Sequence, residues 1–288
     1  MSGESRLRPG YEVEVISTGD EIVFGQLVDT NSSWIAKEVT EQGARVRRLS
    51  CVGDDLEDIV KAVDGGLSEG WDLIVITGGL GSSPDDLTIE AIAKATGKKV
   101  VYDERALKML ELTCREASIT LTERRKRMAR LVEGSEPIEN SLGLAPGLRM
   151  TIGRTLLIAL PGIPKEMKPM FKRFVLPLIS KNTVKRAAAM KLHILMPYYN
   201  AFPILHTLHL LFPNVYIKPH SKPPTHEKDP EQVYGMNVDV VVWGNSRSDC
   251  EDRLKEVKSR LVHCVEEKGG RVSIQKVNDY GTRDVGLP

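Results

Sequence analysis

Short apolar runs alternate with amphipathic stretches through the first 180 or so residues of the chain. The runs at 11–18, 72–77 and 155–160 are rich in Val, Ile or Leu, as in strands buried within a sheet. Between them, apolar residues recur at helical spacing, for example over 56–63. This α/β alternation predicts a three-layer α/β/α sandwich with a mostly parallel sheet over residues 1–180. Ligands of such folds bind outside the carboxyl ends of the strands, so the loops that follow the strands are expected to share one rim.

The pattern changes after Ile179. The stretch 180–189 is polar, then basic, then small, which predicts a linker. Beyond it, strands are predicted at 191–196, 215–218, 238–243 and 271–275, helices at 202–212 and 249–268, and a Pro- and Lys-rich loop at 220–231. The order β-α-β-β-α-β predicts a small α+β domain of the split βαβ type over 190–277.

Composition excludes several classes of protein. Forty Lys and Arg residues balance 39 Asp and Glu residues, so no overall positive field attracts nucleic acid. No apolar run is long enough to span a membrane, and residues 1–9 lack the apolar centre of a secretory signal. The four cysteines form no Cys-x-x-Cys pair, which is typical of reduced thiols. We therefore expect a cytoplasmic protein that binds neither nucleic acid nor membrane.

The loop with the strongest chemical signal directly follows the apolar run 72–77 and reads TGGLGSSPDD. Glycines allow the backbone to approach a ligand closely, and amides ahead of a helix bind phosphate. The lysine of a Walker A loop is missing, and the spacing is not that of a dinucleotide fingerprint. The predicted phosphate contacts are Gly78, Gly79, Gly81, Ser82 and Ser83.

Two pairs of adjacent carboxylates follow predicted strands. Asp85 and Asp86 end the glycine-rich loop, and Asp20 and Glu21 come after Thr18 and Gly19. Neighbouring carboxylates repel one another unless a cation lies between them, and carboxylates beside phosphate oxygens are typical magnesium ligands. The alternatives are that Asp85 or Asp86 caps the next helix and that Asp20 and Glu21 belong to a solvated turn.

Further candidates lie after other predicted strands, and each has a structural alternative. Asn31 comes two residues after Asp29, and Asp54 follows the predicted strand at 45–50. Either side chain could cap a helix rather than contact a ligand. Glu166, after Pro161 and Gly162, lies in the first turn of a predicted helix, where the helix dipole favours a carboxylate in any case. Asn140 and Gly143 belong to a turn-rich loop or hairpin that ends at residue 147.

Two clusters of charged or metal-binding residues are interpreted as structural. The basic run 124–127 predicts a solvated helix face, with phosphate binding as the less favoured alternative. His206 and His209 have i, i+3 spacing but no evident third ligand, so no metal site is predicted there.

Together these motifs resemble a known family. STGDEI with DTN, TGGLG followed by DD, N-x-x-G-x-A-P-G and LPGIPKEM occur in this order between about residues 11 and 179. They resemble the molybdopterin-binding-like domain of the competence/damage-inducible CinA family, which shares its sandwich fold with MogA- and MoaB-type proteins. The chain departs from the family pattern at Ser82-Ser83-Pro84, where Pro-Thr is usual. A KH-like small domain is implied after it, and the deamidase domain of longer members is not expected.

The resemblance implies either hydrolysis of ADP-ribose at its pyrophosphate, or binding or adenylylation of molybdopterin. The leading hypothesis is metal-assisted hydrolysis, in which Asp85, Asp86 and Asp20 or Glu21 hold Mg²⁺, Mn²⁺ or Co²⁺. Glu166 or Asp54 would then take a proton from water. The alternative is a non-catalytic protein that binds a phosphorylated nucleotide or molybdopterin.

The resemblance also implies a state of assembly and a set of ligand-binding residues. A homo-oligomer is expected, and RNA binding by the small domain is disfavoured because it lacks a GXXG loop. The predicted ligand-binding positions are Thr18, Gly19, Asp29, Asn31, Gly78, Gly79, Gly81, Ser82, Ser83, Asn140, Gly143, Pro161 and Gly162.

Overall fold

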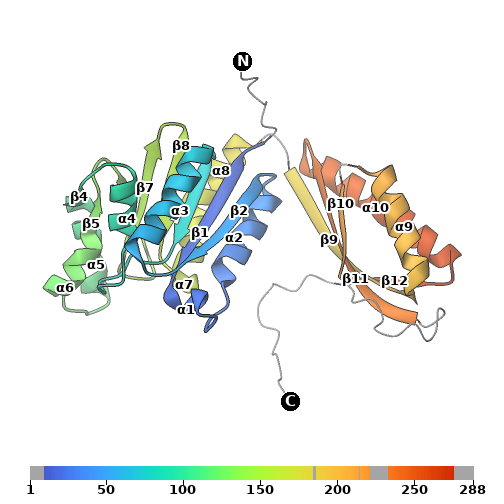
Figure 1. The fold of residues 1–288 in the computed structure, drawn as a ribbon, viewed down its shortest axis with the longest axis horizontal. Coiled ribbons are helices and arrows are strands. Elements are labelled where there is room, and N and C mark those ends of the chain that lie inside the picture. Colours follow the sequence, from blue (N-terminus) through green and yellow to red (C-terminus); the bar gives the residue numbers. More distant parts are fainter. Residues whose placement is uncertain (1–9, 184–185, 214, 221–232, 276–288) are drawn as a thin grey trace. The chain divides into compact units, whose positions relative to one another are not determined.

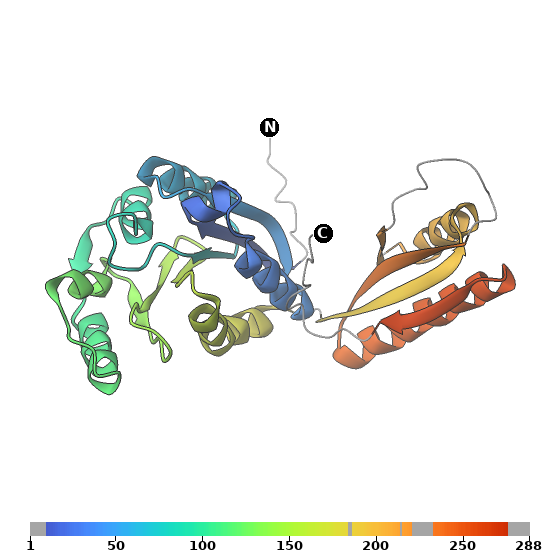
Figure 2. The same ribbon diagram turned by 90° about the horizontal axis from the view of Figure 1, so that it is seen from below.

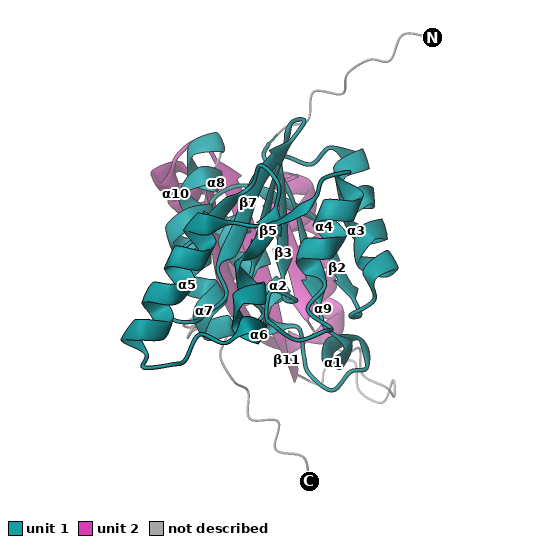
Figure 3. Ribbon diagram, turned by 90° about the vertical axis from the view of Figure 1, so that its left-hand side faces the viewer, with its two compact units in different colours: residues 1–183 teal, residues 184–288 magenta. Residues whose placement is uncertain are grey.

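The computed structural model describes residues 10–183, 186–213, 215–220 and 233–275. The chain forms two compact units, Met1–Thr183 and Val184–Pro288 (Figure 3). The predicted linker 180–189 is wrong at both ends, because helix α8 (Leu176–Asn182) covers its start and strand β9 (Arg186–Pro197) its last residues. β9 pairs along its whole length with β11 (Val233–Gly244), down to Arg186 opposite Gly244. Pairing therefore extends the strand into residues whose sequence carries no strand pattern.

The first unit contains a six-stranded sheet in the order β2-β1-β3-β8-β7-β6 (Figure 1). Four strands are parallel: β1 (Glu12–Thr18), β2 (Arg45–Val52), β3 (Leu73–Thr77) and β8 (Thr155–Leu160). β7 (Gly147–Ile152) runs antiparallel to β8, and β6 (Glu136–Ile138) antiparallel to β7. The predicted mostly parallel sheet is confirmed. The segment interpreted as a turn-rich loop or hairpin that ends at residue 147 is the turn of the β6–β7 hairpin, whereas the two strands themselves were not predicted, because they are short and partly polar.

Helices cover both faces of this sheet, as Figure 2 shows from below. Ile16, Ile74 and Ile76 face α3 (Leu56–Glu69), α4 (Thr88–Ala95) and α5 (Glu104–Glu116). Val15 and Val75 point the other way, toward α2 (Thr30–Glu41), α7 (Pro164–Met170), the π-helical turn Phe171–Val175 and α8. Successive residues of a strand face opposite sides, so a run that is apolar at every position fills two cores. The three-layer α/β/α sandwich is confirmed.

The remaining elements of the unit are short. They are α1 (Asp20–Val23), α6 (Glu123–Lys126), the 3₁₀ turn Arg127–Ala129, and the antiparallel pair β4 (Val100–Tyr102) and β5 (Arg130–Val132). Both β6 and β8 are antiparallel to β7, so their carboxyl ends point the same way. Figure 1 shows α1, α6 and α7 along this lower end of the unit. We call it the rim: it carries the loops that follow β1, β2, β3, β6 and β8.

The second unit has the predicted order β-α-β-β-α-β. Its antiparallel sheet, in the order β10-β11-β9-β12, adds β10 (Val215–His220) and β12 (Arg271–Gln275) to β9 and β11. Helices α9 (Tyr198–Leu211) and α10 (Arg247–Glu267) pack on one side of it (Figure 1). The predicted loop 220–231 lies outside the described residues except for His220, which ends β10. The apolar residues that recur at helical spacing along the predicted helix 249–268 are buried on α10: Leu254, Val257, Leu261 and Val265.

Candidate functional site

The glycine loop (residues 78–86) passes directly against the end of β1. Gly78 and Gly79 have φ angles of 112° and 63°, which favour glycine. A Cβ atom on Gly78 would lie 2.5 Å from the carbonyl oxygen of Thr18. Thr88, which was not predicted, fixes the loop, because its hydroxyl donates to the Gly78 carbonyl at 2.8 Å. The glycines are therefore required for both backbone conformation and space.

Several hydrogen-bond donors of this loop are free. The amides of Gly79, Leu80, Gly81 and Ser82 have no hydrogen-bond partner among the described residues. The Thr18 hydroxyl is buried, has no partner there either, and would lie 3.2 Å from a Cβ on Gly79. A buried polar group without a partner costs about 1–3 kcal/mol. Four successive amides and a neighbouring hydroxyl without partners among the described residues are donors of the kind that bind an anion.

The two aspartates of the loop play different parts. Asp86 accepts a hydrogen bond from the Ser83 amide at 2.7 Å and so closes the loop on itself. Asp85 is exposed, and a hydrogen bond from the Ser83 hydroxyl, with a smaller contribution from the charge of Arg124, lowers the pKa of its carboxyl. Neither aspartate caps α4, which has Leu87 at its N-cap and no side-chain cap. The capping interpretation is therefore wrong for this pair.

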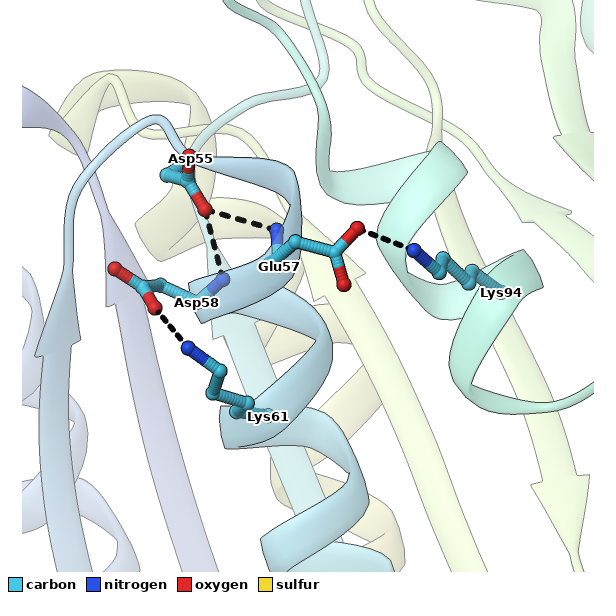
Figure 4. A network of polar contacts seen from close by, with 5 residues as sticks. All are labelled: Asp55, Glu57, Asp58, Lys61 and Lys94. Atoms are coloured by element: carbon cyan, nitrogen blue, oxygen red, sulfur yellow. Dashed lines mark hydrogen bonds and ion pairs between the residues drawn. The ribbon is translucent and has the colours of Figure 1, made fainter.

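Asp20 and Asp54 hold the ends of β1 and β2 together. The Asp20 amide donates to the Asp54 carboxylate, and the Asp54 amide donates to the Asp20 carboxylate, both at 3.1 Å. Asp55, not Asp54, caps α3 by accepting from the amides of Glu57 and Asp58 (Figure 4). The capping alternative for Asp54 is wrong, and its carboxylate lies on the rim instead.

Negative charge accumulates around Asp54. Partial burial raises the pKa of its carboxyl, and the charges of Asp20, Glu21 and Asp85 raise it further. These four carboxylates come from the loops after β1, β2 and β3, as the shared rim predicted. In the described part of the chain, however, no three His, Cys, Asp or Glu side chains are close enough to hold a metal ion by themselves.

Asp54→Asn is expected to stabilise the first unit at pH 7. Because the folded-state pKa is raised, ionised Asp54 destabilises the fold, and stability is lost as the pH rises from the ordinary value through the raised one. The amide oxygen of asparagine can still accept from the Asp20 amide, so only the charge is removed. We expect a gain of about 0.5–1 kcal/mol, which is about 1–3 °C in Tm. Differential scanning fluorimetry should show the gain shrinking as the pH falls toward 4; a lower Tm for the variant at pH 7 would contradict it.

Asp29 and Asn31 organise the start of α2. Asp29 caps the helix by accepting from the Ser32 amide at 2.9 Å, and it also accepts from the Ser17 hydroxyl at 2.7 Å. Asn31 is not the cap. Its amide donates to the Thr77 hydroxyl at 3.0 Å and to the Gly162 carbonyl at 2.7 Å, so it connects the loops after β3 and β8. Its oxygen is buried without a partner among the described residues.

The loops after β6 and β8 are joined by Asn140 and Glu166. The Asn140 amide donates to the Glu166 carboxylate at 2.7 Å and to the Ala145 carbonyl at 3.0 Å. A Cβ atom on Gly143 would collide with the same carboxylate, so a larger residue there would displace the Glu166 side chain. Pro164 takes the first position of α7, where its fixed φ angle suits the start of a helix. Glu166 thus anchors the 140–145 loop.

The loop after β8 also supports the glycine loop. The Pro161 carbonyl accepts from the Thr77 hydroxyl at 3.1 Å, and a Cβ on Gly162 would lie 3.3 Å from Gly78 Cα. Since β3 lies between β1 and β8 in the sheet, the glycine loop is at the centre of the rim. Asp20 and Asp54 lie on one side of it, and Asn140 and Glu166 on the other.

Two arginines of the basic run 124–127 lie beside the glycine loop. Arg127 lines a narrow cleft together with Gly79, Gly81 and Asp86, and Arg124 is close enough to act electrostatically on Asp85. The run was predicted as a solvated helix face with phosphate binding as the less favoured alternative, and the structure shows that two of its members adjoin the loop. Its one sequence signal was the i, i+3 spacing, which places two side chains on the same face of a helical turn.

Comparison with known proteins shows which family the chain belongs to. Residues 14–181 match the family model described as "Probable molybdopterin binding domain". The chain belongs to this molybdopterin-binding-domain family. A protein of Pyrococcus furiosus is 35% identical over 255 residues, which cover 86% of this chain and 96% of that protein. A protein of Metallosphaera sedula is 31% identical over 270 residues, which cover 90% of this chain and 96% of that protein.

A solved structure also supports the family membership. CinA of Thermoplasma acidophilum, described as a protein with unknown function, is 40% identical with a TM-score of 0.53. The similarity covers 56% of this chain and 95% of that chain. The CinA-like resemblance, which rested on the order of four motifs, is confirmed.

The four cysteines are free thiols in the structure. His206 and His209 both lie on α9, and no helix in the described segments is long and apolar enough to cross a membrane.

Proposed function

We propose that the rim binds the phosphate group of a small phosphorylated pterin or nucleotide. The observation that carries the proposal is a set of donors that have no partner within the described ranges: the amides of residues 79–82 and the buried Thr18 hydroxyl. A phosphate offers several acceptor oxygens to such a set, and its charge strengthens each hydrogen bond. The molybdopterin-binding family supports a pterin-type ligand, and the glycine loop by itself recognises phosphate rather than a ring.

The carboxylates beside the loop make binding dependent on cations. Asp20, Asp54 and Asp85 would repel a phosphate, whereas a divalent cation between them and the phosphate attracts both. Mg²⁺ commonly uses one or two protein carboxylates and completes its shell with substrate phosphates and water. The hydrogen-bonded pair Asp20 and Asp54 suits that mode, although no complete protein cage exists among the described residues.

Thr18→Val tests the binding site without removing a contact of the free protein. The hydroxyl has no partner among the described residues, so its loss is expected to leave Tm unchanged or higher. A hydrogen bond to a charged phosphate contributes about 1.5–3 kcal/mol, so affinity should fall about 10-fold or more. Isothermal titration with AMP and ADP-ribose, each with and without Mg²⁺, measures this, with adenosine as the ligand that lacks phosphate.

Ser135→Ala is the matched control. Ser135 is also buried, and its hydroxyl also lacks a partner among the described residues, but it lies in the turn between β5 and β6. Ser135→Ala should leave Tm unchanged or raise it, as expected for Thr18→Val, and should leave the affinity for phosphorylated ligands unaltered. Equal affinities for wild type and Thr18→Val, or no binding of any phosphorylated ligand, would overturn the proposal.

A finer proposal is that the ligand is a dinucleotide pyrophosphate such as ADP-ribose and that the protein hydrolyses it. In this finer proposal Asp54 is the general base and not a metal ligand, and the observation that favours it is the position of its carboxylate on the rim, where it accepts from the Asp20 amide at 3.1 Å. A divalent metal held by Asp20 or Asp85 would polarise a phosphoryl oxygen when bound. Release of AMP from ADP-ribose with Mg²⁺, Mn²⁺ or Co²⁺, lost in Asp54→Asn, is the expected result.

Binding without AMP release would instead favour the alternatives, a non-catalytic binding protein or one that adenylylates molybdopterin. A cytoplasmic location and a homo-oligomeric state also remain proposals. Light scattering during size-exclusion chromatography measures the latter.

A further inference from the structure

Helix α9 of the second unit has two apolar faces. Its buried face packs beneath the sheet and α10, and consists of Ala201, Ile204, Leu205 and Leu208. On the opposite face, Tyr199, Phe202 and Leu210 are 51%, 56% and 67% exposed. Together with the exposed His206 they follow one another at intervals of three or four residues, so they form one stripe along the helix. We call these four residues the α9 stripe.

The helix that carries the stripe contains no Asp, Glu, Lys or Arg. Surface helices normally carry charged or polar residues on the face opposite the core, and a helix that is apolar on both sides is normally covered on both sides. At its start, the ring centroids of Tyr198 and Phe202 are 6.0 Å apart, and those of Tyr198 and Tyr199 are 5.9 Å apart. Aromatic residues are enriched at the centres of protein interfaces. The stripe therefore has the composition of an interaction surface.

The chemistry of α9 limits what covers the stripe. Helices that lie on a membrane surface are rich in Lys and Arg on their polar side, and α9 has neither. A strongly charged partner would find no opposite charge on this helix. The segment 221–232, which lies outside the described residues, contains no large apolar residue, and no two of the four in 276–288 are adjacent. An uncharged, apolar surface fits the stripe best.

Helix α10, which packs beside α9, carries charges of both signs next to this surface. Three pairs of opposite charge lie along it: Arg247 with Glu251, Arg253 with Asp249, and Lys255 with Asp252. A neutral stripe beside a charge-balanced helix can meet an identical copy of itself without an excess of like charge. Stable dimers bury about 800 Å² per partner, which is more than one helix stripe supplies, so the interface is expected to include part of α10 as its polar border.

We propose that the α9 stripe packs against the α9 stripe of a second copy of this chain, around a two-fold axis. In such a contact the same patch serves both partners, and each pair of residues occurs twice. With the two helices antiparallel, Tyr199 and Phe202 of each copy meet Leu210 of the other. The inference assigns a surface and an even number of copies to the expected homo-oligomer. It is independent of the proposed function, because the stripe contains no residue of the rim.

Light scattering of the full chain over a series of concentrations tests the proposal, and wild type should form a dimer. Phe202→Glu and Leu210→Glu each place a charge at one end of the stripe, where burial in an interface is unfavourable. Each variant should raise the dissociation constant of the dimer about 10-fold or more. Both side chains are exposed in the single chain, so the circular dichroism spectrum should not change.

Tyr216→Glu and Leu112→Glu are the matched controls, since they place the same charge at side chains that are 47% and 53% exposed. Tyr216 alternates with the buried Val215 on β10, so it points to the side of the sheet away from the helices. Leu112 lies on α5 of the first unit. Both control variants should dimerise as wild type does.

The mass of the assembly decides the matter. A monomeric wild type would overturn the proposal, and so would an assembly of three copies, which a two-fold contact cannot form. An oligomer that persists unchanged in Phe202→Glu and Leu210→Glu, or that dissociates equally in Tyr216→Glu, would also overturn it. A larger assembly whose mass is halved by both stripe variants would support it, because one of its contacts would then be the stripe.

Discussion

Gly78→Ala is expected to lower the Tm of the first unit by about 5–15 °C and to abolish phosphate binding. The φ angle of 112° is unfavourable for alanine, and the new Cβ would lie 2.5 Å from the Thr18 carbonyl oxygen and 2.6 Å from its hydroxyl. Backbone strain of about 1–3 kcal/mol adds to overpacking of about 1–3 kcal/mol. Neither the end of β1 nor the glycine loop can give way without moving the free amides. Thermal unfolding and titration with ADP-ribose measure the two effects.

Gly97→Ala separates strain from crowding. Gly97, just after the end of α4, also has a positive φ, 64°, but nothing lies within 4 Å of the position that its new methyl group would take. It should cost only the strain of about 1–2 kcal/mol and leave ligand affinity unchanged. A Gly78→Ala protein as stable as Gly97→Ala would show that the loop is not packed against Thr18 as described.

Asn31→Asp is expected to destabilise the first unit by about 3–5 kcal/mol. The side chain is 9% exposed and its amide donates to both the Gly162 carbonyl and the Thr77 hydroxyl. The Thr77 hydrogen is already donated to the Pro161 carbonyl, so a carboxylate in this place would face two oxygen atoms without a donor. Two hydrogen bonds become two repulsions, and the loops after β3 and β8 separate. Ligand binding at the rim should be lost with them.

The pH dependence of the stability of Asn31→Asp identifies the cause of its destabilisation. A protonated carboxyl can again donate to the Gly162 carbonyl, so the deficit of the variant relative to wild type should shrink as the pH falls toward 5. Asn182→Asp, which alters an exposed amide that donates to the Leu178 carbonyl, is the control and should cost less than about 1 kcal/mol. A deficit that is independent of pH, or equal in the two variants, would contradict the role given to Asn31.

Much of the fold could be predicted from local patterns. The runs that form β3 and β8 are apolar at nearly every position, which is a property of strands covered on both faces. The apolar spacing of α10 identified four of its five buried residues for the same reason, since a helix with one apolar stripe can bury only that stripe. The strands of the β6–β7 hairpin and the start of β9 escaped prediction because their stability comes from the partner strand rather than from their own residues, although the turn of the hairpin was predicted.

Some residues of the candidate site were also predicted from the sequence, and others were not. The glycine loop, Asp20 and Asp54 were named from their places after strands, and the structure brings them to one rim. The role of Asp86 as the closure of its own loop and that of Thr88 were not predicted, and the sequence did not indicate which members of the basic run 124–127 adjoin the loop. The role of each of these residues depends on which neighbouring group its side chain contacts in the folded protein.

The sequence by itself determined the order of the elements, the positions that must be glycine and the edge of the sheet at which polar loops gather. These follow from hydrophobic periodicity and backbone sterics, which act over a few residues. Only the tertiary structure decided which carboxylates cap helices, which arginines adjoin the glycine loop and which amides stay free. Tertiary packing determines which hydrogen-bond and ion-pair partners far apart in the chain come within reach of one another. The spacing of residues within one segment carries no information about these partners.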